Sequence, residues 1–313
     1  MAMKKIIVTG ATGQIGSELV LELRKKYGVS EVIAVGHSKP AAGELLNGPF
    51  ETADATDKES LTELVKKYQP DTIFHLAGLL SATGEKNPDL AWDINLGGLK
   101  NILDISRDCG VKQVFWPSSI AAFGPTTPLN ATPQHTILEP TTIYGVTKVA
   151  GELLCQYYFK KYGLDVRSLR YPGLISYKTQ PGGGTTDYAV AIYFEALKQK
   201  AYNCFVSAET VLPMMYMPDA VRATIELMEA PSENIKVRTS YNLTAMSFSA
   251  SELAESITKK IPEFVCTYSP DERQKIADSW PRSIDDSAAR ADWGWSHHYD
   301  LEAMTEDMLK NLN

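Results

Sequence analysis

The segment TGATGQIG, residues 9–16, constrains the fold most strongly because of what flanks it. An apolar run, KKIIVTG, leads into it, and an amphipathic stretch, SELVLELRKKYG, follows it. Gly10, Gly13 and Gly16 are spaced as GxxGxxG. In a strand, turn and helix unit, such glycines allow a tight turn, a close approach of backbone to a pyrophosphate and close helix packing. The helix N-terminus adds unpaired N–H groups. The segment therefore predicts a dinucleotide-binding site.

The same strand and helix pattern continues through about residue 172. Apolar runs alternate with amphipathic segments, which is typical of parallel strands joined by crossover helices. We expect strands at residues 4–10, 31–36, 49–54, 72–78, 113–119 and 165–173. We expect helices at residues 17–28, 59–68, 96–110 and 144–163. The pattern predicts an α/β fold, a doubly wound parallel Rossmann sheet with a smaller C-terminal α/β substrate-binding domain.

The strict alternation fades after residue 172. Helices expected at residues 189–201, 218–230 and 249–261 are mixed there with short strand-like pieces. We expect residues 1–172 to form the Rossmann domain, with residues from about 212 to 244 returning to it. Residues 173–313 would form mainly a substrate-binding, lid-like domain.

Composition and charge exclude several classes of function. The net charge of −7 gives no reason to expect binding to a polyanion, so nucleic acid is not an expected partner. No segment approaches the roughly 18 consecutive apolar residues that a membrane span requires, and we expect a cytoplasmic protein without a membrane partner. The 4 cysteines are far apart and follow no metal-binding spacing, so we expect neither a disulfide nor a metal.

A second motif, YGVTK at residues 144–148, suggests catalytic chemistry. Tyr144 and Lys148 lie four residues apart on one face of an expected helix. An ammonium group beside a phenol favours the phenolate, so we expect a lowered pKa for Tyr144 and a role as general base. Ser119 ends an expected strand, at the sheet edge where such folds bind ligands, and can hydrogen-bond a reacting oxygen. Separately, a surface Tyr/Lys pair and a turn-forming serine are common.

With these three motifs, nearly the whole chain resembles the extended short-chain dehydrogenase/reductase superfamily. Within it, the chain resembles the short-chain type of L-threonine 3-dehydrogenase at residues 75–88, 170–190, 212–231 and 279–295. The resemblance implies oxidation of L-threonine to 2-amino-3-ketobutyrate, with hydride transfer to NAD. Two alternatives stay open: a nucleotide-sugar epimerase or dehydratase of the same superfamily, and a nonenzymatic dinucleotide sensor.

The resemblance also implies which residues form the site. The expected catalytic residues are Ser119, Tyr144 and Lys148. The expected cofactor contacts are Gly10, Gly13, Gln14, Ile15, Gly16, Asp54, Ala55, Leu76, Ala77, Gly78, Asn95, Tyr144, Lys148, Tyr171 and Pro172. The expected substrate contacts are Ser81, Ser119, Tyr144, Gly184, Thr185 and Thr186. The flexible run PGGGTTDY, residues 181–188, would close over a small zwitterion and offer glycine N–H groups to its carboxylate.

Three expectations carry their own alternatives. NAD-specific folds usually end the second strand with an acid, but this strand ends in Gly36; the family implies NAD, while His37, Ser38 and Lys39 permit NADP. Asn95 can anchor a proton-relay water, as the family implies, or serve as a capping residue. A homodimer is expected from the superfamily, through helices near residues 95–107 and 145–161, unless their apolar faces are covered internally.

Overall fold

The structure is a computed structural model that describes residues 3–312. Its centre is a sheet of 7 strands with the order β10-β6-β5-β4-β1-β2-β3, and every neighbouring pair is parallel. The strands are β1 (Ile6–Thr9), β2 (Val32–Gly36), β3 (Phe50–Thr52), β4 (Thr72–His75), β5 (Gln113–Ser119), β6 (Asp165–Tyr171) and β10 (Tyr241–Asn242). The predicted Rossmann-like α/β fold is therefore confirmed. The order reverses between β1 and β4, which is where sheets of this kind bind their ligands.

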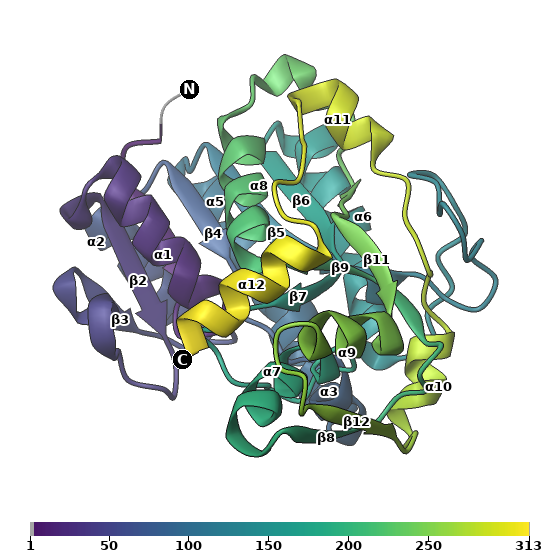
Figure 1. Cartoon of the computed structure of the whole chain (residues 1–313). Helices are drawn as coiled ribbons and strands as arrows, with labels where there is room; N and C mark the ends of the chain where they lie inside the picture. The colour runs from purple at the N-terminus through teal and green to yellow at the C-terminus, as the bar shows by residue number, and fades with distance from the viewer. Residues whose placement is uncertain (1–2, 313) are drawn as a thin grey trace.

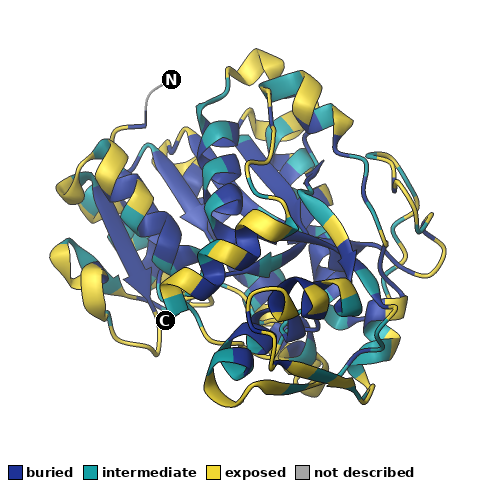
Figure 2. Cartoon of the chain, viewed as in Figure 1, coloured by how far each residue is buried: buried dark blue, intermediate teal, exposed yellow. Residues whose placement is uncertain are grey.

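Helices cover both faces of this sheet (Figure 1). Successive residues of a strand point to opposite faces, and β1 shows the consequence: Ile6 is buried against one set of helices and Ile7 against the other. The first set is α1 (Gln14–Tyr27) and α8 (Met217–Glu229). The second set is α2 (Lys58–Tyr68), α5 (Gly98–Cys109) and α6 (Ile143–Tyr162). Buried strands lie at the centre and exposed residues on the outer helix faces and loops (Figure 2).

The segment between β4 and α5 is more helical than the sequence analysis predicted. It contains α3 (Ser81–Lys86), α4 (Pro88–Trp92) and a π-helical turn, η3 (Asp93–Gly97), which continues directly into α5. A π turn widens a helix locally and occurs often at functional sites. Here it brings Asn95 to the inner side of the helix, where it is buried.

The C-terminal part forms a second layer beside the carboxyl ends of the strands (Figure 1). One small sheet holds β7 (Gly173–Ile175), β9 (Val211–Tyr216) and β11 (Met246–Ser249), and another holds β8 (Ala201–Cys204) and β12 (Val265–Tyr268). The helices are α7 (Tyr188–Gln199), α9 (Ala250–Thr258), α10 (Arg273–Asp278), α11 (Ser287–Trp293) and α12 (Leu301–Leu312). Apart from α11, whose buried Ala289 packs in the core of the large sheet, these elements share a core that includes Ile120 and Phe123, which follow β5.

Residues 217–242 contribute α8 and β10 to the large sheet and its helix layer. We propose residue 172 as the boundary of the dinucleotide-binding domain, with α8 and β10 assigned to that domain. Short 3-10 helices complete the chain at η1 (Val29–Glu31), η2 (Gly43–Asn47), η4 (Ile120–Ala122) and η5 (Ser232–Asn234). In the described range, no helix combines the length and the apolarity needed to cross a membrane.

Candidate active site

The glycine-rich turn between β1 and α1 has the geometry of a phosphate site. Gly10 has a φ of +69°, and a Cβ there would lie 2.6 Å from the backbone nitrogen of Ala77. A Cβ at Gly16 would overlap the carbonyl oxygen of Gly10. Helix α1 begins after Gly13 without a side-chain cap and without an acid in its first turn. Its free N–H groups and the helix dipole therefore favour an anion, so the turn fits a dinucleotide pyrophosphate.

Two neighbouring cavities lie along the carboxyl ends of the strands. The catalytic cavity, of about 150 Å³, is bounded by the ends of β4, β5 and β6 and by α6. The edge cavity, of about 510 Å³, is bounded by the glycine-rich turn and the ends of β2 and β3. Both are lined by Leu76, Ala77, Gly78 and Leu79, which follow β4. Two cavities that share these four lining residues suit a ligand with two separate ends.

Most residues predicted as ligand contacts line one of these cavities. The catalytic cavity is lined by Gln14, Ile15, Leu76, Ala77, Gly78, Tyr144, Lys148, Tyr171 and Pro172 from the predicted cofactor set. It is also lined by the whole predicted substrate set, Ser81, Ser119, Tyr144, Gly184, Thr185 and Thr186. The edge cavity is lined by Gly10, Gly13, Asp54 and Ala55. Gly16 and Asn95 line neither cavity.

The first turn of α6 places Tyr144 and Lys148 beside the end of β5. The Thr142 hydroxyl oxygen accepts a hydrogen bond from the backbone N–H of Gly145 at 3.1 Å, which caps the helix. Lys148 Nζ donates to the carbonyl oxygen of Pro117 at 2.6 Å and lies 5.2 Å from the centre of the Tyr144 ring. Ser119 Oγ accepts from the N–H of Ala121 at 3.2 Å, so its own O–H can act as a donor toward the cavity.

Burial displaces the pKa values of both groups on α6. Desolvation raises the pKa of Tyr144 to about 12, and an interaction with the Ser119 side chain acts in the opposite direction. This direction is opposite to the lowering expected from Lys148, because burial penalises the phenolate more than its neighbours stabilise it. Desolvation also lowers the pKa of Lys148 to about 7. A cavity with displaced pKa values on two adjacent groups is typical of a catalytic site.

A buried ion pair joins α6, the helix that carries Tyr144 and Lys148, to the large sheet. Glu152, one turn after Lys148, accepts from Arg170 Nε at 2.8 Å and from Arg170 Nη2 at 2.6 Å. Ser118 donates to the same carboxylate at 2.6 Å, and Arg170 also donates to Asn242 Oδ1 at 3.0 Å. These contacts join α6 to β5, β6 and β10. Sequence reasoning missed this pair; the spacing of Glu152 four residues after Lys148 was the available signal.

Asn95 and His75 lie behind the cavities. Asn95 Oδ1 accepts from the N–H of Leu79 at 2.7 Å, and Asn95 Nδ2 donates to Leu79 O at 3.2 Å and to Thr147 Oγ1 at 3.3 Å. Asn95 thus ties the loop after β4 to α6.

His75 is fully buried, with Nδ1 2.7 Å from Thr9 Oγ1, and burial lowers its pKa to about 3. His75 is therefore a neutral core residue.

The loop before α7 forms the outer wall of the catalytic cavity. Thr185 is buried, with its hydroxyl oxygen 3.5 Å from that of Ser81. The N–H groups of Gly183 and Gly184 both donate to Asp187 Oδ2 at 2.8 Å. These amides are therefore engaged by Asp187, and the expectation that they face a ligand carboxylate does not hold in this structure.

Two further residues of the catalytic cavity were missed from the sequence. Asp187 and Trp280 both line it. Asp187 follows the glycine run directly, so its position beside flexible amides was a usable signal. Trp280 follows α10, nearly a hundred residues further along the chain, and belongs to the segment 279–295 that carries the family resemblance without having been assigned to the site. Tyr171, by contrast, was predicted, but its hydroxyl is paired with Thr224 on α8 and is not free for a ligand.

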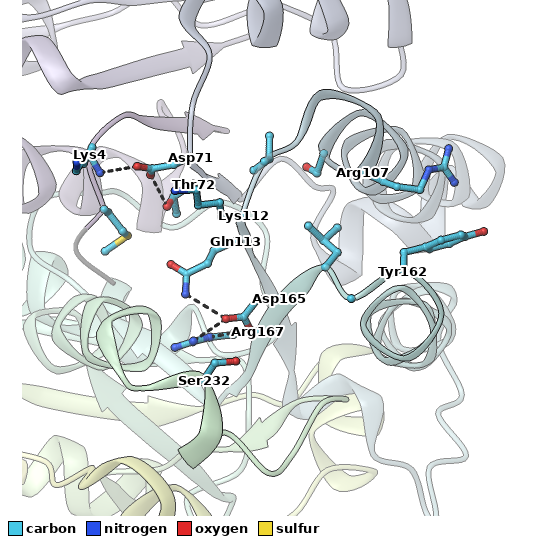
Figure 3. Close-up of a pocket in the computed structure, with 15 residues that line it drawn as sticks. Lys4, Asp71, Thr72, Arg107, Lys112, Gln113, Tyr162, Asp165, Arg167 and Ser232 are labelled. Carbon is cyan, nitrogen blue, oxygen red and sulfur yellow. Dashed lines mark hydrogen bonds and ion pairs between the residues drawn. The ribbon is translucent and has the colours of Figure 1, made fainter.

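A third cavity, of about 670 Å³, lies at the amino ends of the strands, away from the other two cavities (Figure 3). Its two carboxylates are engaged: Asp71 accepts from the backbone N–H of Lys4 at 2.9 Å, and Asp165 pairs with Arg167 at 2.7 Å. Sheets of this kind bind ligands at their carboxyl edge, so we do not place the active site here. Among residues 3–312, His, Cys, Asp and Glu side chains form no group of three that could hold a metal.

The comparison with known families agrees with this geometry. The sequence model of the NAD dependent epimerase/dehydratase family matches residues 6–243. The chain belongs to this family, which is part of the extended short-chain dehydrogenase/reductases. An uncharacterized epimerase/dehydratase of Staphylococcus saprophyticus is 55% identical over 98% of this chain and 96% of its own length.

Several solved structures that are similar to this one at about half sequence identity are L-threonine dehydrogenases. The enzyme from Clostridium difficile has a TM-score of 0.96 at 53% identity, covering 100% of this chain and 98% of its own. The holo form of the GalE-like enzyme from Cupriavidus necator has a TM-score of 0.96 at 52% identity, covering 99% of this chain and 100% of its own. A metagenomic L-threonine 3-dehydrogenase, at 50% identity, TM-score 0.95 and 98% coverage of both chains, is described as monomeric. Family and structures together support an oxidoreductase that uses a nicotinamide dinucleotide.

Proposed function

We propose that the protein oxidises the side-chain alcohol of L-threonine to 2-amino-3-ketobutyrate, with NAD as hydride acceptor. The observation that carries this proposal is the convergence of Ser119, Tyr144 and Lys148 with the hydroxyls of Thr185 and Thr186 on one cavity. At about 150 Å³, this cavity is far smaller than the roughly 300 to 1,000 Å³ of sites for drug-sized ligands. The size favours an amino acid over a nucleotide sugar.

The proton chemistry belongs to Tyr144. A secondary alcohol loses hydride readily only as its O–H proton departs, so a base must meet that oxygen. Tyr144 accepts the proton, and Ser119, whose own proton is free, donates a hydrogen bond to the same oxygen. Hydride acceptance is the chemistry that a nicotinamide held beside Tyr171 and Pro172 in this cavity would supply. Lys148, when charged, stabilises the phenolate through its position beside the ring.

The zwitterion itself requires separate contacts. Ser81, Thr185 and Thr186 offer hydroxyls to the carboxylate of threonine, and Gly184 lies beside them. Among the residues that line this cavity, Asp187 is the one carboxylate, and it is suited to face the ammonium group of threonine. The loop therefore contributes recognition, while α6 and β5 contribute the chemistry.

A second copy of the chain is the proposed macromolecular partner. Of the two helices expected at the interface, α6 has exposed apolar side chains at Val146, Leu153 and Tyr157, whereas α5 has no large exposed one; Leu90 and Trp92 are exposed on α4, which packs against α6. An apolar face of this kind is a common dimer interface. We expect light scattering to give the mass of a dimer, and Leu153→Glu to give a monomer. A parent protein that is monomeric at micromolar concentration would contradict this part of the proposal.

The function itself is tested by following NADH absorbance with purified protein, NAD and L-threonine. We expect NADH formation with L-threonine and none with D-threonine, because the zwitterion contacts fix one orientation at the β-carbon. Conversion of a UDP-sugar without net NADH formation would instead identify an epimerase. Tight NAD binding with neither reaction would identify a dinucleotide sensor.

A further inference from the structure

The end of β2 lacks the acidic side chain by which dinucleotide-binding folds select NAD. That acid normally bonds the 2′-hydroxyl of the adenosine ribose and repels a 2′-phosphate. Gly36 stands at this position, and it is buried. A Cβ on Gly36 would lie 2.7 Å from Cζ of Phe50 and 3.3 Å from Thr12 Cγ2. Phe50 on β3 thus occupies the space into which the side chain of an acid at position 36 would extend.

The residues that follow Gly36 have the opposite chemistry. His37, Ser38 and Lys39 are exposed and line the edge cavity, so they can supply two potential cations and a hydroxyl to a bound anion. A phosphate needs such groups, because charge-assisted hydrogen bonds to its oxygens replace lost hydration.

Asp54 is the one carboxylate that lines the edge cavity, and its own contacts occupy it. Its Oδ1 accepts from the N–H and from the hydroxyl of Thr56, both at 2.8 Å. Its Oδ2 lies 3.5 Å from His37 Nε2. The hydrogen bonds from Thr56 lower the pKa of Asp54, and His37 acts in the same direction. Asp54 is therefore ionised at neutral pH, with Thr56 bonded to one of its oxygens and His37 near the other.

We propose that the edge cavity accepts the 2′-phosphate of an adenosine ribose, held by Lys39, Ser38 and His37, so that the protein binds NADP as well as NAD. This inference rests on the nicotinamide dinucleotide site of the proposed function. It is independent of the identity of the alcohol that is oxidised.

Binding without any substrate tests the inference. Dissociation constants of NADPH and NADH are measured by the fluorescence of the reduced nicotinamide, and those of 2′,5′-ADP and 5′-AMP by calorimetry. We expect NADPH to bind within threefold of NADH or more tightly, and 2′,5′-ADP to bind more tightly than 5′-AMP. NADPH binding more than threefold weaker than that of NADH would overturn the inference, whether or not threonine is oxidised.

Variants assign the phosphate to these residues. We expect Lys39→Ala to weaken NADPH and 2′,5′-ADP binding by about three- to tenfold and to leave NADH binding unchanged. Lys112→Ala removes the same charge at the opposite edge of the sheet (Figure 3) and is expected to change neither. Equal loss of NADPH and NADH affinity in Lys39→Ala, or no loss of either, would refute the assignment. Failure of threonine oxidation alongside selective NADPH loss would reject the proposed function alone.

Discussion

The two walls of the catalytic cavity are built very differently. On one side, α6 and the ends of β5 and β6 are buried and joined by the Glu152–Arg170 ion pair and by Lys148. On the other side, residues 181–183 are exposed, and the glycine amides of the loop are held by a single carboxylate, that of Asp187.

This difference suggests a division of work between the two walls. Groups that transfer a proton must be held within a fraction of an ångström, and buried networks provide that order. Groups that admit and enclose a substrate must open, and a glycine-rich segment with few contacts can do so. Changes on the α6 wall should therefore affect turnover and stability, and changes on the loop should affect the Michaelis constant.

The largest expected effect is that of Lys148→Met. Removing the ammonium group beside Tyr144 should lower kcat for threonine by about 10² to 10⁴-fold, the range of general acid–base contributions. Lys161→Met lies on the same helix but is exposed, and it should retain parental turnover. Parental kcat in Lys148→Met would remove Lys148 from the mechanism.

The same variant has a predictable effect on stability. Because burial lowers the pKa of Lys148 from 10.5 to about 7, the unfolded chain binds more protons than the folded one between these values. Lys148 therefore makes the free energy of unfolding of the parent increase as pH rises from about 7 to 10.5. The free energy of unfolding of Lys148→Met, taken relative to that of the parent, should be highest below pH 7. This difference should shrink as pH rises toward 10.5. Denaturant unfolding of both proteins across this range measures the trend.

The ion pair beneath the catalytic helix should dominate stability. Glu152→Gln leaves the guanidinium group of Arg170 buried without its counter-charge, which should cost about 3 to 5 kcal/mol of the free energy of unfolding. Glu263→Gln, at an exposed position, should cost almost nothing. The measurement is urea unfolding, and a loss below about 1 kcal/mol for Glu152→Gln would show that the α6 wall does not depend on this pair.

The loop should contribute to binding more than to turnover. Thr186→Ala removes a hydroxyl proposed to bond a carboxylate, a contact worth about 1.5 to 3 kcal/mol. The Michaelis constant for threonine should rise roughly ten- to a hundredfold, with NAD affinity unchanged. Thr186→Ser keeps the hydroxyl and should recover most of the loss. An unchanged Michaelis constant in steady-state kinetics would count against the loop as a substrate contact.

The smallest expected effect on stability is that of Asp187→Ala. It frees two glycine amides to bond water, so the cost in unfolding free energy should be about 0.5 to 2 kcal/mol, comparable to the loss of a helix cap. Hydrogen exchange at residues 183 and 184 should accelerate, because Asp187 accepts from both amides. Asp187→Asn retains an acceptor oxygen and should protect these amides partly. Unchanged exchange in Asp187→Ala would show that other contacts hold the loop.

The sequence predicts β1, β2 and β4 well because these buried parallel strands are nearly continuous apolar runs. GxxGxxG and YxxxK are also local patterns, so they place the glycine-rich turn and the two side chains on α6. The three-residue strand β7 is too short for a periodic signal. The Glu152–Arg170 pair and Trp280 depend on segments brought together only by folding. The pKa of Tyr144 is displaced in the direction opposite to the one expected from Lys148 because burial, which a sequence does not reveal, exceeds the effect of its neighbours.

The central claim, that Tyr144 takes the proton of an amino-acid alcohol at this cavity, is tested most directly by Tyr144→Phe. Turnover of L-threonine and the dissociation constant of NADH should be measured on the same preparations of parent and variant. The account predicts a fall in kcat of about 10² to 10⁴-fold with NADH affinity unchanged, because the ring remains and only its hydroxyl is lost. Oxidation of threonine by the variant at the parental rate would contradict it.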